Sequence, residues 1–205
     1  MDEIVLRTFG QLSYKNPRDI LVELRSLELE LAGSDTPSKI KSLRTNSLNL
    51  YRQMREAALF CHFMSERIGY NVYFSLSEDQ DYDFIARWDI DNTRHYAPVQ
   101  LKEVVPKNTN SSATLEDVLN SLNKYVDSKN LIVAVHLNQE YHYDPQKLIL
   151  PNLTIAELWV FGATSQDQTC WCLWGNLLQD SIHTPHQYPV TKLPISQVTP
   201  YYPSF

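Results

Sequence analysis

Apolar residues in the first third of the chain recur every three or four positions, which is the spacing of one face of an α-helix. One such series begins at Ile20 and ends at Leu31, just before Gly33, a residue suited to a helix end. A second series runs from the Thr36-Pro37 pair to Gly69 and contains the polar triplet 45–47. The pattern therefore predicts a helix over residues 20–31 and, over residues 36–69, either one long helix or two.

After Gly69 the hydrophobic pattern changes from a helical to a strand-like one. Three segments rich in β-branched and aromatic residues follow one another: VYFSLS (72–77), DYDFIARWDI (81–90) and YAPVQLKEVV (96–105). The Asp91-Asn92 pair stands between the last two, where a hairpin turn would lie. The sequence therefore predicts three consecutive strands after the long helical region.

The second half of the chain adds one helix and three strands. Thr114 is a good N-cap, with acidic residues in the turn that follows, and starts an apolar series that continues to Val126. LIVAVHL (131–137) is typical of a buried strand, and ELWVFGA (157–163) and CWCLWG (170–175) are predicted to form a hairpin. Residues 184–205 hold five of the 11 prolines, which favours an extended tail.

These elements predict a single α/β domain in four parts. Residues 1–37 form an N-terminal helical extension, 38–137 an αβββαβ core, 138–183 an accessory β-hairpin and 184–205 the proline-rich tail. The length of 205 residues suffices for one hydrophobic core, and 43% hydrophobic against 20% charged residues excludes a disordered or fibrous chain.

Charge and cysteine content narrow the function classes. A net charge of −6 argues against a protein that coats nucleic acid through a globally positive surface. Three cysteines do not indicate a disulfide framework, the start of the chain lacks the features of a signal peptide, and no apolar run is long enough to span a membrane. We therefore expect a cytoplasmic protein with no membrane partner.

Candidate chemistry gathers on the second and third predicted strands. Side chains alternate across a strand, so Gln100 and Lys102 share one face of the third strand. If the two strands pair as a hairpin, Asp83 can stand beside Gln100 on that face, with Asp81 as the alternative acid. Glu78 and Asp79 are typical of loop charges. An acid, an amide and an amine are thus expected to converge.

Glu56 is a further candidate, on the predicted long helix. Leu59, Phe60 and Phe63 follow it at helical spacing, so its carboxylate is expected against apolar surface. A carboxylate in such a place is costly unless a cation or hydrogen bond compensates it. A metal ion shared with Asp83 would do so, and an ion pair with Arg52 on the same helix is the alternative.

On these residues and this order of elements, residues 38–137 resemble the PD-(D/E)XK, or restriction-endonuclease-like, nucleases. The resemblance implies an αβββαβ core and Mg²⁺-dependent (or Mn²⁺-dependent) cleavage of nucleic acid, DNA foremost. It assigns Asp83 as the metal-binding acid, Gln100 to the acidic position of the D/E-x-K element, Lys102 as its lysine and Glu56 as the helical acid. The glutamine departs from the motif, as in the Q-x-K variants of the superfamily.

The resemblance also implies a ligand set and a mechanism. Asp83, the Gln100 amide oxygen, the Leu101 carbonyl and Glu56 would surround a hard divalent ion. Such an ion polarises a phosphoryl group and lowers the pKa of an attacking water, while Lys102 orients that water or offsets developing charge.

Phosphate contacts are expected from the predicted long helix. Residues 38–67 contain six basic and two acidic residues, a net charge of +4. The expected contacts are Lys41, Arg44, Arg52 and Arg55. The alternative to an enzyme is a non-catalytic nuclease-fold module that binds a protein partner or a second copy of itself within a larger defence or mobile-element assembly.

Two other patterns have more ordinary explanations. Cys170 and Cys172 with His183 and His186 form a C-x-C…H-x-x-H set that suits zinc, but an apolar strand has the same appearance. Trp159, Trp171 and Trp174 could stack on bases, but packing in a hairpin core is the more common role of such residues. His136 and His142 have no evident partner in the sequence and are expected to be structural.

Overall fold

The computed structural model describes residues 2–35, 37, 44–45, 48–77, 81–126, 128–139, 148–165, 168, 170–179 and 191–192. Its helices are α1 (Glu3–Gly10), α2 (Pro17–Ala32), α4 (Asn49–Ile68) and α5 (Leu115–Ser121), the last continued by a 3-10 turn, η2 (Leu122–Lys124). Its strands are β1 (Tyr73–Leu76), β2 (Phe84–Ile90), β3 (Thr93–Val104), β4 (Ile132–Leu137), β5 (Glu157–Ala163), β6 (Cys170–Trp174) and β7 (Thr191–Lys192). Among these residues no helix is long and apolar enough to cross a membrane.

All seven strands form one mixed sheet in the order β1-β2-β3-β4-β5-β6-β7. The first three strands form an antiparallel meander, β3, β4 and β5 run parallel, and β6 and β7 return antiparallel. The turn between β2 and β3 is made by Asp91 and Asn92, both with positive φ (47° and 64°), as a tight two-residue hairpin requires. The predicted hairpin and its turn are confirmed.

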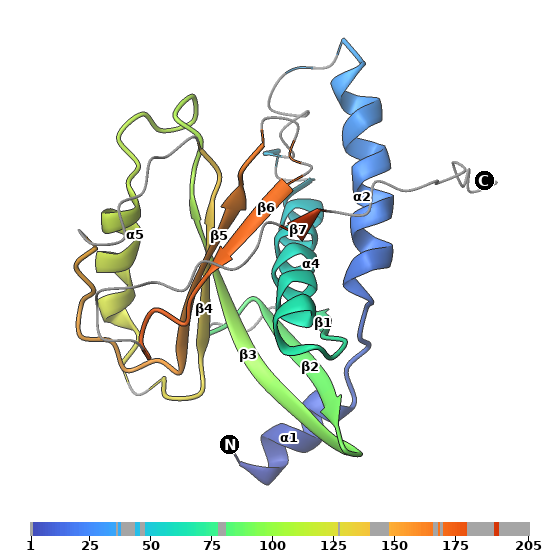
Figure 1. Ribbon diagram of the computed structural model, residues 1–205, viewed down its shortest axis with the longest axis vertical. Helices are drawn as coiled ribbons and strands as arrows, with labels where there is room; N and C mark the ends of the chain where they lie inside the picture. Colours follow the sequence, from blue (N-terminus) through green and yellow to red (C-terminus); the bar gives the residue numbers. More distant parts are fainter. Residues whose placement is uncertain are drawn as a thin grey trace, which may run out of the picture.

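Helices cover both faces of the sheet (Figure 1). Helix α4 packs on one face, which we call the α4 face, and α2 packs against α4; their core includes Ala58, Leu101 and Phe161. Helix α5 packs on the other, the α5 face, against a second core that includes Val133 and Val135 of β4. Neighbouring residues of β3 and β4 therefore belong to different cores, because their side chains alternate between the faces.

Several boundaries differ from the prediction for local reasons. Helix α4 runs from Asn49 to Ile68 and is followed by Gly69 in the left-handed conformation (φ 74°); residues 36, 38–43 and 46–47 of the predicted helical region lie outside the described residues. The N-terminal extension holds two helices instead of one: α1 is capped by the Asp2 side chain, and α2 by that of Asn16. The predicted C-terminal hairpin is present, but it extends the core sheet through β4–β5 pairing and is not a separate unit.

Candidate functional site

The β2–β3 hairpin brings Asp83 and Gln100 together. Asp83 immediately precedes β2, and its backbone N–H donates to the Val99 carbonyl at 2.9 Å, which continues the ladder that pairs Phe84 with Val99. The Asp83 Oδ2 atom accepts hydrogen bonds from the Leu101 N–H at 2.6 Å and from the Gln100 side-chain amide. The expected contact between the two side chains is present, whereas the alternative acid, Asp81, is exposed.

The same contact gathers the oxygen atoms named for a metal ion. The Gln100 Nε2 donates both to Asp83 Oδ2 and to the Leu101 carbonyl, the latter at 3.2 Å. The Asp83 carboxylate and the Leu101 carbonyl, two of the expected oxygen ligands, thus accept hydrogen bonds from one N–H₂ group. A half-turn of the amide would present its oxygen at the same place. Carboxylate, carbonyl and amide oxygens are the donors a hard divalent cation prefers, so this set fits Mg²⁺ or Mn²⁺.

Burial works against the charged forms of the two ionisable groups here. Burial raises the pKa of Asp83, although the Leu101 N–H and the charge of Lys102 act in the opposite direction, and the charge of Glu56 raises this pKa further. Burial lowers the pKa of Lys102, which Asp83 partly counteracts. The Lys102 ammonium lies 5.5 Å from the centre of the Tyr125 ring. The Asp83 carboxylate and the Lys102 ammonium are therefore both partly dehydrated, and their mutual attraction does not fully offset the cost of burying either charge.

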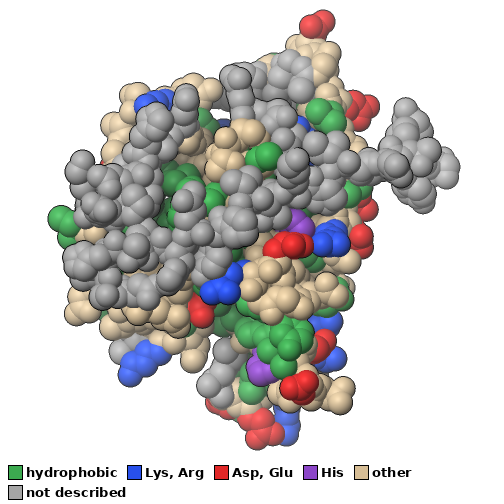
Figure 2. Space-filling view, viewed as in Figure 1, with side chains coloured by type: hydrophobic (Ala, Val, Ile, Leu, Met, Phe, Trp, Pro, Cys, Tyr) green, Lys and Arg blue, Asp and Glu red, His purple; other side chains and the backbone are tan. Residues whose placement is uncertain are grey.

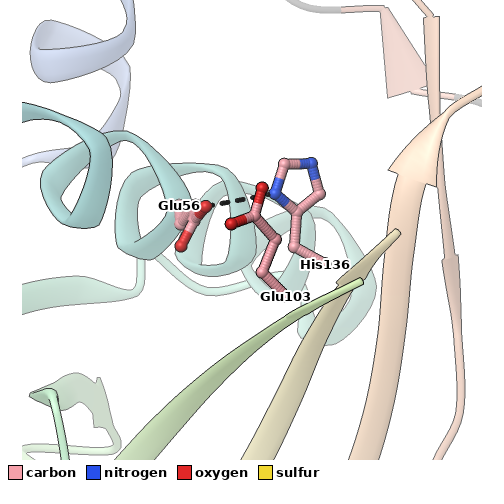
Figure 3. Close-up of side chains that lie close together, drawn as sticks. All are labelled: Glu56, Glu103 and His136. Atoms are coloured by element: carbon pink, nitrogen blue, oxygen red, sulfur yellow. Dashed lines mark hydrogen bonds and ion pairs between the residues drawn. The ribbon is translucent and has the colours of Figure 1, made fainter. Parts of the chain in front are cut away.

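A second polar group lies on the α4 face, between α4 and the parallel strands. It consists of Glu56 from α4, Glu103 from β3 and His136 from β4 (Figure 3). The β3–β4 register places Glu103 beside His136, and His136 Nδ1 lies 3.3 Å from Glu56 Oε1. One ligand atom from each of the three residues lies within 4.8 Å of the others, so the group has the donors for a metal ion.

Arginines already neutralise the carboxylates of this group. Arg44 pairs with Glu103, and Arg52 Nη1 lies 2.8 Å from Glu103 and 3.8 Å from Glu56. Asn138 Nδ2 donates to Glu103 Oε1 at 2.7 Å. Although burial alone would raise the pKa of Glu103, Asn138, His136 and Arg44 together hold it below its usual value. Two carboxylates face two guanidiniums, so the group is satisfied without an ion.

The four residues assigned by the resemblance divide between the two faces of β3. Gln100 and Lys102 pair with Val133 and Val135, and so point to the α5 face. Glu56 lies across the α4 face, where it contacts His136 and Arg52. Glu56 therefore does not join Asp83 as a ligand and instead forms the ion pair with Arg52 that was the alternative. Its charge still raises the pKa of Asp83.

Three of the four basic residues predicted to contact phosphate have partners within the chain. Arg44 and Arg52 bind Glu103, and Arg55 pairs with Glu28 and donates to Gln168 Oε1 at 2.6 Å. On the face drawn in Figure 2, the Lys and Arg side chains that are visible lie apart from one another. These guanidiniums are used within the fold, and the phosphate contact expected of them stays a prediction. Lys41 lies outside the described residues.

Sequence reasoning missed Glu103 and did not find the partner of His136. A usable signal was present: Glu103 shares a strand face with the apolar Val99 and Leu101, and His136 lies within an apolar run. Buried polar groups need partners. Their pairing depends on the β3–β4 register, which the sequence does not specify.

Most of the remaining predictions fall on the C-terminal half. Trp159 and Trp171 are 5% and 1% exposed, which confirms a core role over base stacking. Cys172 is buried on β6 and Cys170 is half-buried. His183, His186, His142, Glu78, Asp79 and most of the tail lie outside the described residues; Thr191 and Lys192 of the tail form β7.

Comparisons with family models, curated proteins and solved structures found no match to this chain.

Proposed function

We propose that the chain is a metal-dependent nuclease, with DNA as the foremost substrate, whose site is formed by Asp83, Gln100, Leu101 and Lys102. The observation that carries the proposal is the convergence of Asp83 Oδ2 and the Leu101 carbonyl on the Gln100 amide. The order α4-β1-β2-β3-α5-β4 supports it, because this is the αβββαβ order expected of the restriction-endonuclease-like core.

Each residue has a definite task in this proposal. Asp83, the Leu101 carbonyl and the Gln100 amide oxygen would hold Mg²⁺ or Mn²⁺, and a bound ion would supply Lewis acidity for the phosphoryl group and for an attacking water. Lys102 places its ammonium beside the carboxylate, where it orients the attacking water or offsets charge that develops on phosphate oxygens. The backbone N–H of Leu101 fixes the orientation of the Asp83 carboxylate.

A cleavage assay with supercoiled and linear DNA in Mg²⁺ or Mn²⁺ tests the proposal. We expect nicking or degradation by the wild-type chain, and a loss of at least about 100-fold in Lys102→Ala. Lys124→Ala is the matched control, since Lys124 Nζ lies 5.1 Å from the centre of the same Tyr125 ring but has no task in the proposed site. Full activity of Lys102→Ala, or an inactive wild-type chain with both metals, would overturn the assignment.

A non-catalytic nuclease-fold module is the second candidate, and one observation favours it: Arg44, Arg52 and Arg55 are paired with carboxylates of the chain itself. Such a module would bind a protein partner or a second copy of itself, not phosphate. Calorimetric titration with Mg²⁺ and Mn²⁺ separates the two candidates. No heat and no thermal shift, together with a stable protein complex or homodimer in light scattering, would favour the module.

A further inference from the structure

Tyr125 lies in the crossover between β3 and β4, and its ring meets a side chain of the strand from which that crossover starts. It directly follows η2, and it packs against the core on the α5 face. Its N–H donates to the Leu122 carbonyl at 3.0 Å, and its own carbonyl accepts from Thr154 Oγ1 at 3.0 Å. Because the core and both backbone groups hold this residue, its ring has a defined place on the α5 face.

The Tyr125 ring lies beside the charged groups of the proposed site. The Lys102 ammonium lies over the ring, 5.5 Å from its centre. Burial raises the pKa of Tyr125; the charge of Lys124 lowers this pKa, and the charges of Asp83 and Asp81 raise it further. The phenol is thus within electrostatic range of the carboxylate assigned to the metal ion. One aromatic side chain therefore contacts the amine of the site and lies near its acid.

Lys102 needs a support of this kind to keep its ammonium in the site. A lysine side chain is a flexible four-carbon stem that ends in a strongly hydrated charge, so turning outward would restore its hydration. Burial disfavours the charge of Lys102, and Asp83 counteracts this only in part. The face of an aromatic ring attracts a cation most strongly where water is partly excluded. The Tyr125 ring therefore adds to the attraction from Asp83 and restricts the region that the ammonium occupies.

We propose that Tyr125 is a positioning residue of the site: its ring holds the Lys102 ammonium beside Asp83, and the rate of phosphodiester cleavage depends on this contact. The inference rests on the proposed nuclease function, in which Lys102 orients the attacking water or offsets developing charge. A group with that task acts best when it is held in place before the reaction. Tyr125 acts through Lys102 and not on the substrate, so its ring is required and its hydroxyl is not.

Two exchanges at this position separate the ring from the rest of the side chain. Tyr125→Phe keeps the ring, whereas Tyr125→Leu removes it and leaves an apolar side chain against the core. In the DNA cleavage assay we expect Tyr125→Leu to lower kcat about fivefold with KM unchanged, and Tyr125→Phe to keep the wild-type kcat. Tyr70→Leu, which removes an exposed tyrosine just after α4, is the matched control and should leave both constants unchanged.

NMR of the lysine ε-methylene protons measures the same contact without any cleavage. Protons over an aromatic ring resonate upfield, so the Lys102 signal of the folded wild-type chain should lie upfield of its position in urea. Lys102→Arg assigns the signal by its disappearance. The upfield shift should persist in Tyr125→Phe and be lost in Tyr125→Leu. Wild type and Tyr125→Phe carry the test if Tyr125→Leu does not fold.

The outcomes separate this inference from the proposed function. A folded Tyr125→Leu with the wild-type kcat, or a wild-type Lys102 signal without an upfield shift, would overturn the positioning role even if DNA is cleaved. An equal fall of kcat in Tyr125→Phe would also overturn it, because the hydroxyl would then be required. An upfield shift that depends on the ring, in a chain that cleaves no DNA, would support Tyr125 as the residue that holds Lys102 while the nuclease proposal fails.

Discussion

Two polar groups lie on opposite faces of the same strand, β3, and they are built on different principles. On the α4 face, Glu103 and Glu56 are matched by Arg44 and Arg52, and the pKa of Glu103 is lowered. On the α5 face, burial raises the pKa of Asp83 and lowers that of Lys102. Folding therefore favours the charged form of Glu103 in the first group, whereas it disfavours the charged forms of Asp83 and Lys102 in the second.

The difference is a physical argument for placing the proposed site on the α5 face. A buried ion-pair network that satisfies every carboxylate is costly to break at one partner and leaves little for a ligand to add. A dehydrated acid and lysine side by side cost stability unless a ligand compensates them, and such groups are concentrated at functional sites. A carboxylate-to-amide exchange is nearly isosteric, and the two faces of β3 are expected to respond to it with opposite signs.

The largest effect is expected from Glu103→Gln. This exchange leaves Arg44 and Arg52 facing each other with only Glu56 to balance them, so the free energy of unfolding should fall by about 3 kcal/mol. Urea denaturation measures it. Glu66→Gln is the control, because its pair with Arg18 is on the surface, with 46% of the Glu66 side chain exposed, and should cost less than about 1 kcal/mol. Equal losses in the two variants would contradict a special role for the α4-face network.

Asp83→Asn is expected to raise the free energy of unfolding in metal-free buffer, by about 1 kcal/mol. The amide oxygen can still accept from the Leu101 N–H, and the cost of burying a charge is removed. The same variant should lose any stabilisation by Mn²⁺ in a thermal-shift assay. A destabilised Asp83→Asn would mean that Asp83 is a structural acid like Glu103.

The pH dependence of stability sharpens the same contrast. The pKa of Glu103 is lower in the folded than in the unfolded chain, so its contribution is lost on acidification, as the pH falls from about 5 through this lowered pKa. The pKa of Asp83 is raised on folding, so its titration adds stability as the pH falls. Relative to wild type, Glu103→Gln should therefore lose less stability over that range, and Asp83→Asn more. Parallel pH profiles of the three proteins would contradict the opposed shifts.

The α5-face site was largely predictable because it depends on local rules. The Asp91-Asn92 turn fixes the β2–β3 register, and the register places Asp83 opposite Gln100. Side-chain alternation then puts Lys102 on the face of Gln100. These steps need only contacts between neighbours in the sequence, separated by one hairpin.

The α4-face network was not predictable in the same way. Glu56 and His136 are 80 residues apart, and they meet only because β4 pairs parallel to β3 with Glu103 beside His136. No turn fixes that register, since a crossover through α5 joins the two strands. Helix α1 was missed for a different reason: it is eight residues long, about two turns, and so gives too few positions for a helical repeat of apolar residues to stand out.

The smallest effect is expected from Lys102→Met, because two terms oppose each other there. The exchange removes the unfavourable burial of a charge, which is the cause of the lowered pKa of Lys102. It also removes the contact between the ammonium and the Tyr125 ring, whose centre is 5.5 Å away. Such a contact contributes about 0.5–1 kcal/mol, and the retained methionine stem keeps most of the packing. We therefore expect a gain of no more than about 0.5 kcal/mol in urea denaturation. A clear loss of stability would place Lys102 with the satisfied charges of the α4 face and remove the physical contrast between the two groups.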